Sequence, residues 1–106
     1  MEPMNSRPPS FYLDKDCFVF VYDVIYKQSF EYINEMHHHI SQIRDSKQFP
    51  CIICGNKIDM KNERVISSEE GKALAERLGA QFLEISVKTG EGVQDLLEMC
   101  IKIFAI

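Results

Sequence analysis

The stretch "PCIICGNKIDMKN", Pro50–Asn62, places a short apolar run directly before a crowded polar turn. The run Pro50–Cys54 is apolar and partly β-branched, which predicts a buried strand. An amide, an ammonium and a carboxylate follow as Asn56, Lys57 and Asp59. In parallel α/β sheets, ligands bind beyond the carboxyl ends of the strands. The stretch therefore predicts a strand of such a sheet with a ligand site at its end.

Two further stretches have the pattern of strands. Cys17–Val24 is aromatic and β-branched with almost no polar interruption, which predicts a strand buried on both faces. Gln81–Ser86 predicts a third, shorter strand.

Helical spacing of apolar residues predicts a helix after each strand. Ser29 is the expected N-cap of the first helix. Ser67 and Glu70 form a capping box at the start of the second, and Gly79 is its expected stop. The apolar positions are Phe30, Ile33, Met36, Ile40 and Ile43, then Ala73, Leu74, Ala75 and Leu78, and finally Val93, Leu96, Leu97, Cys100, Ile101 and Phe104.

The expected fold class is α/β, with a three-stranded parallel sheet in β-α-β-α-β-α order and right-handed crossovers. Polar residues follow each strand: Asp23 after the first, 56–59 after the second and 86–88 after the third. We expect these three groups to converge at one edge of the sheet. An unrelated doubly wound domain, such as a receiver, is a weaker reading, because it needs an acidic cluster and Asp23 stands alone.

Composition limits the function classes. A chain of 106 residues with 45% hydrophobic and 26% charged residues is expected to fold as one domain or less. A net charge of −4 gives no electrostatic reason to expect a nucleic acid or an anionic membrane as partner. Neither an apolar run of about 18 residues nor a secretory leader is recognisable.

The cysteines and histidines invite a metal reading that their spacing does not favour. Cys51 and Cys54 are three residues apart in a predicted strand, so they point to opposite faces. We expect core thiols and a reducing, cytoplasmic compartment. Consecutive helical residues fan out by roughly 100°, so the triplet 37–39 of histidines is expected to lie on a solvated helix face.

The chemistry of the polar turn favours one kind of ligand. A fixed carboxylate such as Asp59 accepts two parallel N–H bonds, and guanine presents two such donors side by side. Adenine lacks that pair and would leave the carboxylate without partners. Asn56 can donate to a ring nitrogen, and the stem of Lys57 can cover a purine face.

A second polar cluster, Ser86-Val87-Lys88, stands at the end of the next strand. Asn-Lys-x-Asp followed by this Ser-x-Lys resembles the base-recognition pair of the Ras-like small GTPases, in the P-loop GTPase superfamily. The resemblance extends to "CFVFVYDV", "IRDSKQFPCIICGNKIDM", "VISSEEGKALAERLGAQFLEIS" and "VKTGEGVQDLL". It covers nearly the whole chain from about Phe11 and corresponds to the C-terminal, guanine-base-binding half of the family domain.

The resemblance implies GDP or GTP as ligand and assigns roles to the polar turn. Asp59 would hold the two guanine donors, and Asn56 would contact the imidazole edge of the purine. Lys57 would cover one face of the base and reach the ribose.

The second cluster would complete the base site. Ser86 would orient Asp59, the backbone N–H of Val87 would donate to the guanine carbonyl, and Lys88 would flank the other side of the base. The family usually has alanine where this chain has Val87. Because valine is branched, we expect it to crowd the base and to loosen guanine binding.

The sequence contains none of the family's phosphate-binding motifs. Phosphate binding needs Gly-x-x-x-x-Gly-Lys-[Ser/Thr], but no glycine precedes Gly55. The only threonine is Thr89, and no Asp-x-x-Gly occurs. We therefore expect a truncated form without the P-loop strand, the switch regions and the magnesium ligands. It would contact only the base and would not hydrolyse GTP alone, with no catalytic or metal residue.

Residues 1–10 are expected to be a flexible lead-in, and residues 11–106 a partial small-GTPase domain. Without the P-loop strand beside it, the strand at 17–24 would be an open edge for a protein partner or self-association. The alternative function is therefore a non-catalytic interaction module derived from a small GTPase. No Cys-a-a-X signal ends the sequence, so no prenyl anchor is expected.

Overall fold

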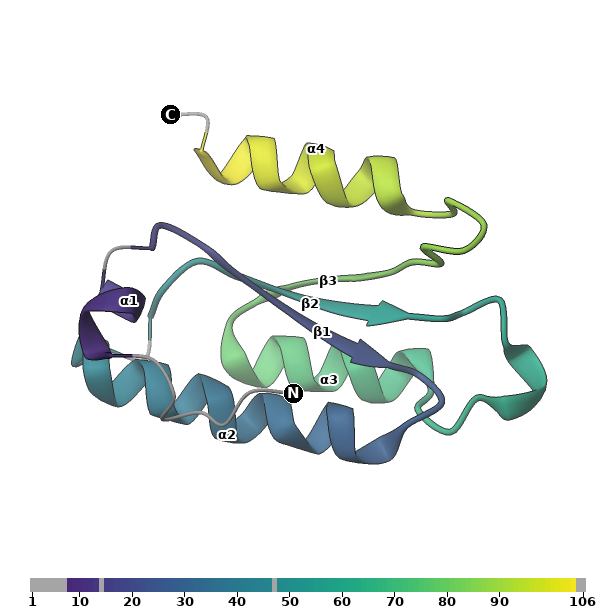
Figure 1. Cartoon of the computed structure of the whole chain (residues 1–106), viewed down its shortest axis with the longest axis horizontal. Coiled ribbons are helices and arrows are strands. Elements are labelled where there is room, and N and C mark those ends of the chain that lie inside the picture. Colours follow the sequence, from purple (N-terminus) through teal and green to yellow (C-terminus); the bar gives the residue numbers. More distant parts are fainter. Residues whose placement is uncertain (1–7, 14, 47, 105–106) are drawn as a thin grey trace.

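The computed structural model describes residues 8–13, 15–46 and 48–104. The elements are α1 (Pro9–Leu13), β1 (Phe18–Asp23), α2 (Lys27–Arg44), β2 (Cys51–Asn56), the 3₁₀ turn η2 (Lys61–Glu63), α3 (Ser68–Leu78), β3 (Gln81–Glu84) and α4 (Val93–Phe104) (Figure 1). From β1 onward they follow the predicted β-α-β-α-β-α order. Helix α1 begins before the predicted domain boundary at residue 11, and residues 1–7 lie outside the described residues.

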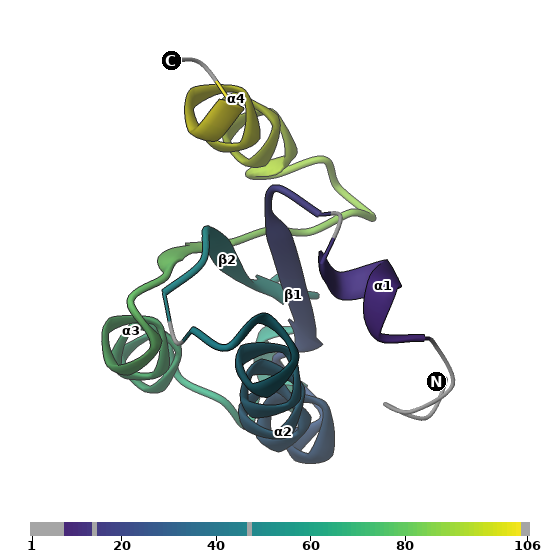
Figure 2. The ribbon, with the colours of Figure 1, turned by 90° about the vertical axis from the view of Figure 1, so that its left-hand side faces the viewer.

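The three strands form one parallel sheet in the order β1-β2-β3. The predicted fold class is therefore confirmed. Helices α2 and α3 cover one face of this sheet, and α4 lies over the other (Figure 2). Strand β2 is central and buried along its length, whereas β1 forms one edge.

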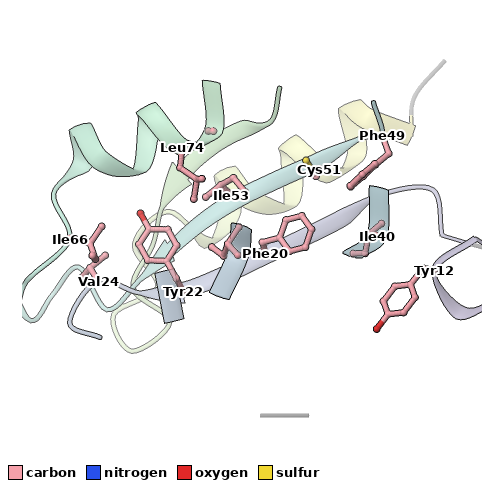
Figure 3. Close-up of a cluster of buried hydrophobic side chains, with 12 residues drawn as sticks. Tyr12, Phe20, Tyr22, Val24, Ile40, Phe49, Cys51, Ile53, Ile66 and Leu74 are labelled. Carbon is pink, nitrogen blue, oxygen red and sulfur yellow. The ribbon is translucent and has the colours of Figure 1, made fainter. Parts of the chain in front are cut away.

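The main core lies between the sheet and helices α2 and α3. Aromatic and β-branched side chains of β1 and β2 point into it, together with residues from both helices (Figure 3). Gly71 of α3 allows close approach, because a Cβ there would overlap the Phe82 ring and lie 2.5 Å from the Tyr22 hydroxyl. None of the helices that the structure describes has the length and apolar character of a membrane span.

Strand β1 is not buried on both faces, contrary to the prediction. Phe20 and Tyr22 point into the core, while Val19 and Val21 on the opposite face are 40% and 53% exposed. On that same face of β2, Ile52 is fully buried. On the α4 side, the sheet is therefore covered at Ile52 of β2 but left half open at Val19 and Val21 of β1.

Ser29 is not the N-cap of α2, which begins at Lys27 with Tyr26 in the cap position. The Ser29 hydroxyl instead accepts the Asp23 N–H at 3.0 Å and donates to the Tyr26 carbonyl at 2.6 Å. It closes the turn between β1 and α2, and this use of the hydroxyl is why the cap prediction was wrong.

The predictions for α3 are confirmed at both ends. Ser67 and Glu70 form the reciprocal capping box, and Gly79 ends the helix in the left-handed region with φ 69°.

The histidines do not share a solvated face. His37 is only 7% exposed, its ring stacks on Phe49 at 4.8 Å, and burial lowers its pKa. His39 meets the Tyr12 ring edge-on, and His38 alone is exposed. The prediction was wrong because α2 packs against the sheet on one side and α1 on another.

Cys51 and Cys54 are core thiols, as predicted, whereas Cys17 and Cys100 are only partly buried. All four are free, and Cys51 and Cys54 are buried in β2, where burial raises the pKa of each thiol to about 11. Among the described residues, no group of three or more His, Cys, Asp or Glu side chains could hold a metal ion.

Candidate functional site

The carboxyl ends of the three strands bring together the polar residues that follow them. Asp23 and Asn56 are paired at the ends of β1 and β2, and Ser86 lies just beyond β3. The turn 57–59 packs against the segment after β3, because the Ile58 N–H donates to the Ile85 carbonyl at 3.3 Å. The three expected clusters therefore form one edge of the molecule.

The turn has a demanding backbone conformation. Lys57 has φ 71°, in the left-handed region that non-glycine residues rarely adopt. Its carbonyl accepts the Met60 N–H at 3.0 Å, which closes the turn. This conformation fixes where the Asp59 carboxylate lies relative to β3.

Ser86 connects the two clusters directly. Its hydroxyl donates to Asp59 Oδ1 at 2.7 Å and accepts the Thr89 N–H at 3.1 Å, and the residue is fully buried. A buried, charge-assisted hydrogen bond of this kind holds the carboxylate in one orientation.

One oxygen of the Asp59 carboxylate can still accept hydrogen bonds. Its Oδ1 receives the Ser86 hydroxyl, and Oδ2 makes no hydrogen bond with any described residue. The side chain is half-buried. A fixed carboxylate with one oxygen available and partial access to solvent can receive a pair of ligand N–H groups.

Asn56 and Val87 form a second link between the clusters. The Val87 N–H donates to Asn56 Oδ1 at 3.2 Å, a contact that the sequence analysis did not predict. The Asn56 amino group has no partner among the described residues and is available to a ring nitrogen. Because the Val87 N–H is already used, a ligand carbonyl would have to take it over or share it.

Lys57 forms an ion pair with Asp23. The sequence predicted Asp23 at the end of the first strand but predicted no partner for it. Lys57 Nζ lies 3.2 Å from Asp23 Oδ2. Both side chains are partly exposed, so the pair is worth at most about 1 kcal/mol. The pair depends on the left-handed turn at Lys57, which no sequence pattern signals. Lys88 is exposed beside Val87, a residue that is 66% exposed.

Two glycines shape the connection from β3 to α4. Gly90 and Gly92 have φ 87° and 78°. A Cβ on Gly92 would lie 2.5 Å from the Glu84 carbonyl oxygen, whereas nothing lies within 4 Å of one on Gly90. Gly92 is therefore the position where the loop after Ser86 must approach β3 closely.

Comparison with known proteins gives this edge its context. The model of the Ras family matches residues 2–105. A GTP-binding protein Rheb homolog of Drosophila melanogaster is 38% identical over 89 residues, which are 84% of this chain and 49% of that protein. The GTP-binding protein Rheb of Mus musculus is 39% identical over 94 residues, 89% of this chain and 51% of that protein.

A Ras-like protein of Laccaria bicolor is 40% identical over 78 residues, 74% of this chain and 37% of that protein. The chain thus spans about half the length of the two Rheb proteins. The family match extends along almost the entire chain. The chain belongs to the Ras family of small GTPases.

Proposed function

We propose that this chain binds GDP and GTP by reading the guanine base. The residues proposed to contact it are Asn56, Lys57, Asp59, Ser86, Val87 and Lys88. The observation that carries the proposal is the 2.7 Å bond by which Ser86 fixes the Asp59 carboxylate. This carboxylate would accept the ring N–H and the exocyclic amino group of guanine.

The neighbouring groups complement the rest of the base. The unpartnered amino group of Asn56 matches a purine ring nitrogen as a donor, and the Val87 N–H matches the guanine carbonyl. The Lys57 stem offers an apolar surface for one face of the ring. Its ammonium would exchange the Asp23 carboxylate for a sugar oxygen, at small cost because the pair is partly exposed.

Affinity is proposed to be weak and independent of phosphate. The sequence contains no Gly-x-x-x-x-Gly-Lys-[Ser/Thr] loop, and the described residues offer no carboxylate or histidine cluster for magnesium. Base contacts alone support a Kd on the order of tens of micromolar to millimolar. We propose that these residues, acting alone as a truncated domain, bind GTP without hydrolysing it. Four free thiols support a reducing, cytoplasmic setting.

A competition experiment tests this function. Fluorescent GDP bound to purified, monodisperse protein is displaced with GDP, GTP, guanosine and ATP. We expect the three guanine ligands to compete with similar potency and ATP not to compete. Equal competition by ATP, or no binding by a folded sample, would overturn the proposal.

A second candidate function is a non-catalytic interaction module. The observation that favours it is apolar exposure, at Val19 and Val21 on β1 and at Leu97 and Ile101 on α4. Such exposure is typical of interaction surfaces. Partner binding that is unchanged in an Asp59→Ala variant would favour this function over guanine binding.

A further inference from the structure

A mostly buried ion pair links the loop after the polar turn to strand β3. Arg64 Nη2 is in direct contact with Glu84 Oε2, and the two side chains are only 22% and 16% exposed. The Asp23–Lys57 pair is more open to solvent, with side chains that are 31% and 43% exposed. Because water and salt screen a buried pair less, Arg64 and Glu84 hold their two segments together more firmly.

The pair belongs to a network in which both carboxylate oxygens of Glu84 are used. Oε2 accepts from Arg64, and Oε1 accepts the Ser68 hydroxyl at 2.8 Å. The Arg64 guanidinium also donates to the Ser68 hydroxyl at 3.2 Å and, through Nε, to the Ile66 carbonyl at 2.6 Å. This set of contacts uses the planar fork of a guanidinium, so a lysine in place of Arg64 would not reproduce it.

The network lies next to both polar clusters of the proposed base site. Arg64 directly follows η2, five residues after Asp59, in a loop beyond the carboxyl ends of β1 and β2 (Figure 1). Glu84 is the last residue of β3 and stands two positions before Ser86. The 2.7 Å hydrogen bond from Ser86 to Asp59 therefore connects the same two segments as the ion pair.

Backbone bonds of the same loop lead to a different strand. The N–H groups of Val65 and Ile66 both donate to the carbonyl of Val24, which directly follows β1, at 2.8 and 3.0 Å. These bonds fix the loop beside the first strand. The link from this part of the loop to β3, which precedes Ser86, is made by the Glu84 carboxylate.

We propose that Arg64 and Glu84 are positioning residues for guanine binding, which set the separation of the polar turn from Ser86 and thereby orient the Asp59 carboxylate. They would act through the Ser86–Asp59 bond and not by touching the base. A carboxylate that receives two N–H groups side by side is sensitive to its angle, because hydrogen bonds weaken as their geometry departs from linear. This inference rests on the proposed binding of guanine.

Displacement of fluorescent GDP tests the pair in Glu84→Gln, which keeps the size of the side chain and removes its charge. We expect GDP affinity to fall by about tenfold, because the guanidinium loses its carboxylate and the loop is released from β3. Arg64→Lys keeps the charge and loses the fork, so this milder variant should weaken GDP binding by a few-fold. Unchanged GDP affinity in both folded variants would overturn the proposal.

Glu70→Ala is the matched control for these variants. It also removes a carboxylate at the start of α3, where Glu70 completes the capping box with Ser67, but it leaves the Arg64–Glu84 contact in place. We expect lower stability in urea and an unchanged GDP affinity. If Glu70→Ala weakens GDP binding as much as Glu84→Gln does, general destabilisation explains both and the proposal is overturned.

A double-mutant cycle with Ser86→Ala distinguishes positioning from other effects. If Glu84 acts through the Ser86–Asp59 bond, Glu84→Gln should weaken GDP binding by less than about twofold once that bond is absent. A full loss of about tenfold in the Ser86→Ala background would show that Glu84 affects binding by another route, contrary to the proposal.

Amide hydrogen exchange without nucleotide separates this inference from the proposed function. The Ile58 N–H donates to the Ile85 carbonyl, so its exchange rate reports how often the two clusters separate. We expect Glu84→Gln to speed exchange at Ile58 by about tenfold, while the Ile33 amide within α2 keeps its rate. Faster exchange at Ile58 in a protein that does not bind GDP would support the ion pair's role and refute base recognition. Unchanged exchange at Ile58 would overturn the role of the pair, whether or not the protein binds GDP.

Discussion

The carboxyl end of β1 and its outward residues differ in how many partners the rest of the chain gives them. At the carboxyl end, Asp23, Asp59 and Ser86 all have polar partners supplied by neighbouring loops. Val19 and Val21, by contrast, are 40% and 53% exposed. Polar groups at this strand end thus find partners on neighbouring loops, whereas Val19 and Val21 stay exposed.

The loop between β3 and α4, which follows Ser86, depends on Gly92. Replacing it with alanine should destabilise the fold by about 3 kcal/mol, the sum of left-handed strain and a clash with the Glu84 carbonyl. Gly90→Ala is the control, because it adds similar strain but no clash and should cost only about 1 kcal/mol. Urea unfolding compares the two, and equal losses would contradict the close approach at Gly92.

Asp59→Ala should remove the carboxylate that we propose selects guanine. Hydrogen bonds to a charged group are worth about 1.5–3 kcal/mol, so GDP affinity should fall by about 10- to 100-fold. Displacement of fluorescent GDP measures it, with Asp95→Ala on α4 as a carboxylate control outside the site. Unchanged GDP affinity in the folded variant would show that Asp59 does not hold the base.

Ser86→Ala should act through Asp59. It removes one buried hydroxyl with bonds to the Asp59 carboxylate and the Thr89 N–H, so GDP binding should weaken by about tenfold. Ser41→Ala provides the matched control, since its buried hydroxyl bonds only within α2. If both variants bind GDP equally, Ser86 does not position the carboxylate.

Val87→Ala should tighten guanine binding by a few-fold, because it removes a branched side chain beside the base and keeps the backbone N–H. The same displacement assay measures the change. A variant that binds no tighter than the wild type would show that Val87 does not crowd the site.

His37 should make stability depend weakly on pH. Burial lowers its folded pKa below the unfolded value of about 6.5, so the unfolded chain binds more protons in the interval between the two values. Stability should therefore fall as the pH drops from about 7.5 to about 5.5. His37→Gln should reduce this slope in urea unfolding, while His38→Gln, at an exposed position, should retain most of it.

Local patterns predicted the elements of the fold well. Alternating strands and helices, the capping box of Ser67 and the glycine stop at Gly79 depend on neighbouring residues alone, so the sequence contains their signal. The cap prediction for Ser29 was wrong because its hydroxyl accepts the Asp23 N–H. The prediction of a solvated His37 was wrong because its ring stacks on Phe49, which is distant in the sequence.

The convergence of the polar clusters was predictable from the sequence, but the bonds between them were not. The clusters 56–59 and 86–88 each stand at a strand end, and parallel topology brings them together. The Asp23–Lys57 pair and the Asn56–Val87 bond depend on the left-handed turn at Lys57 and on loop positions. Such tertiary details have no periodic signal. The burial of β1 was overestimated for a related reason, since a strand pattern does not say whether a helix covers each of its faces.

The central claim is that the base-reading edge selects guanine without phosphate contacts. It is tested most directly by following the Val87 amide in ¹⁵N–¹H NMR spectra while GMP or AMP is added. We predict that GMP shifts this amide in a saturable way, as a guanine carbonyl replaces the Asn56 oxygen, and that AMP leaves it in place. A Val87 amide that stays unmoved by GMP up to millimolar concentration, or that responds equally to AMP, would contradict the claim.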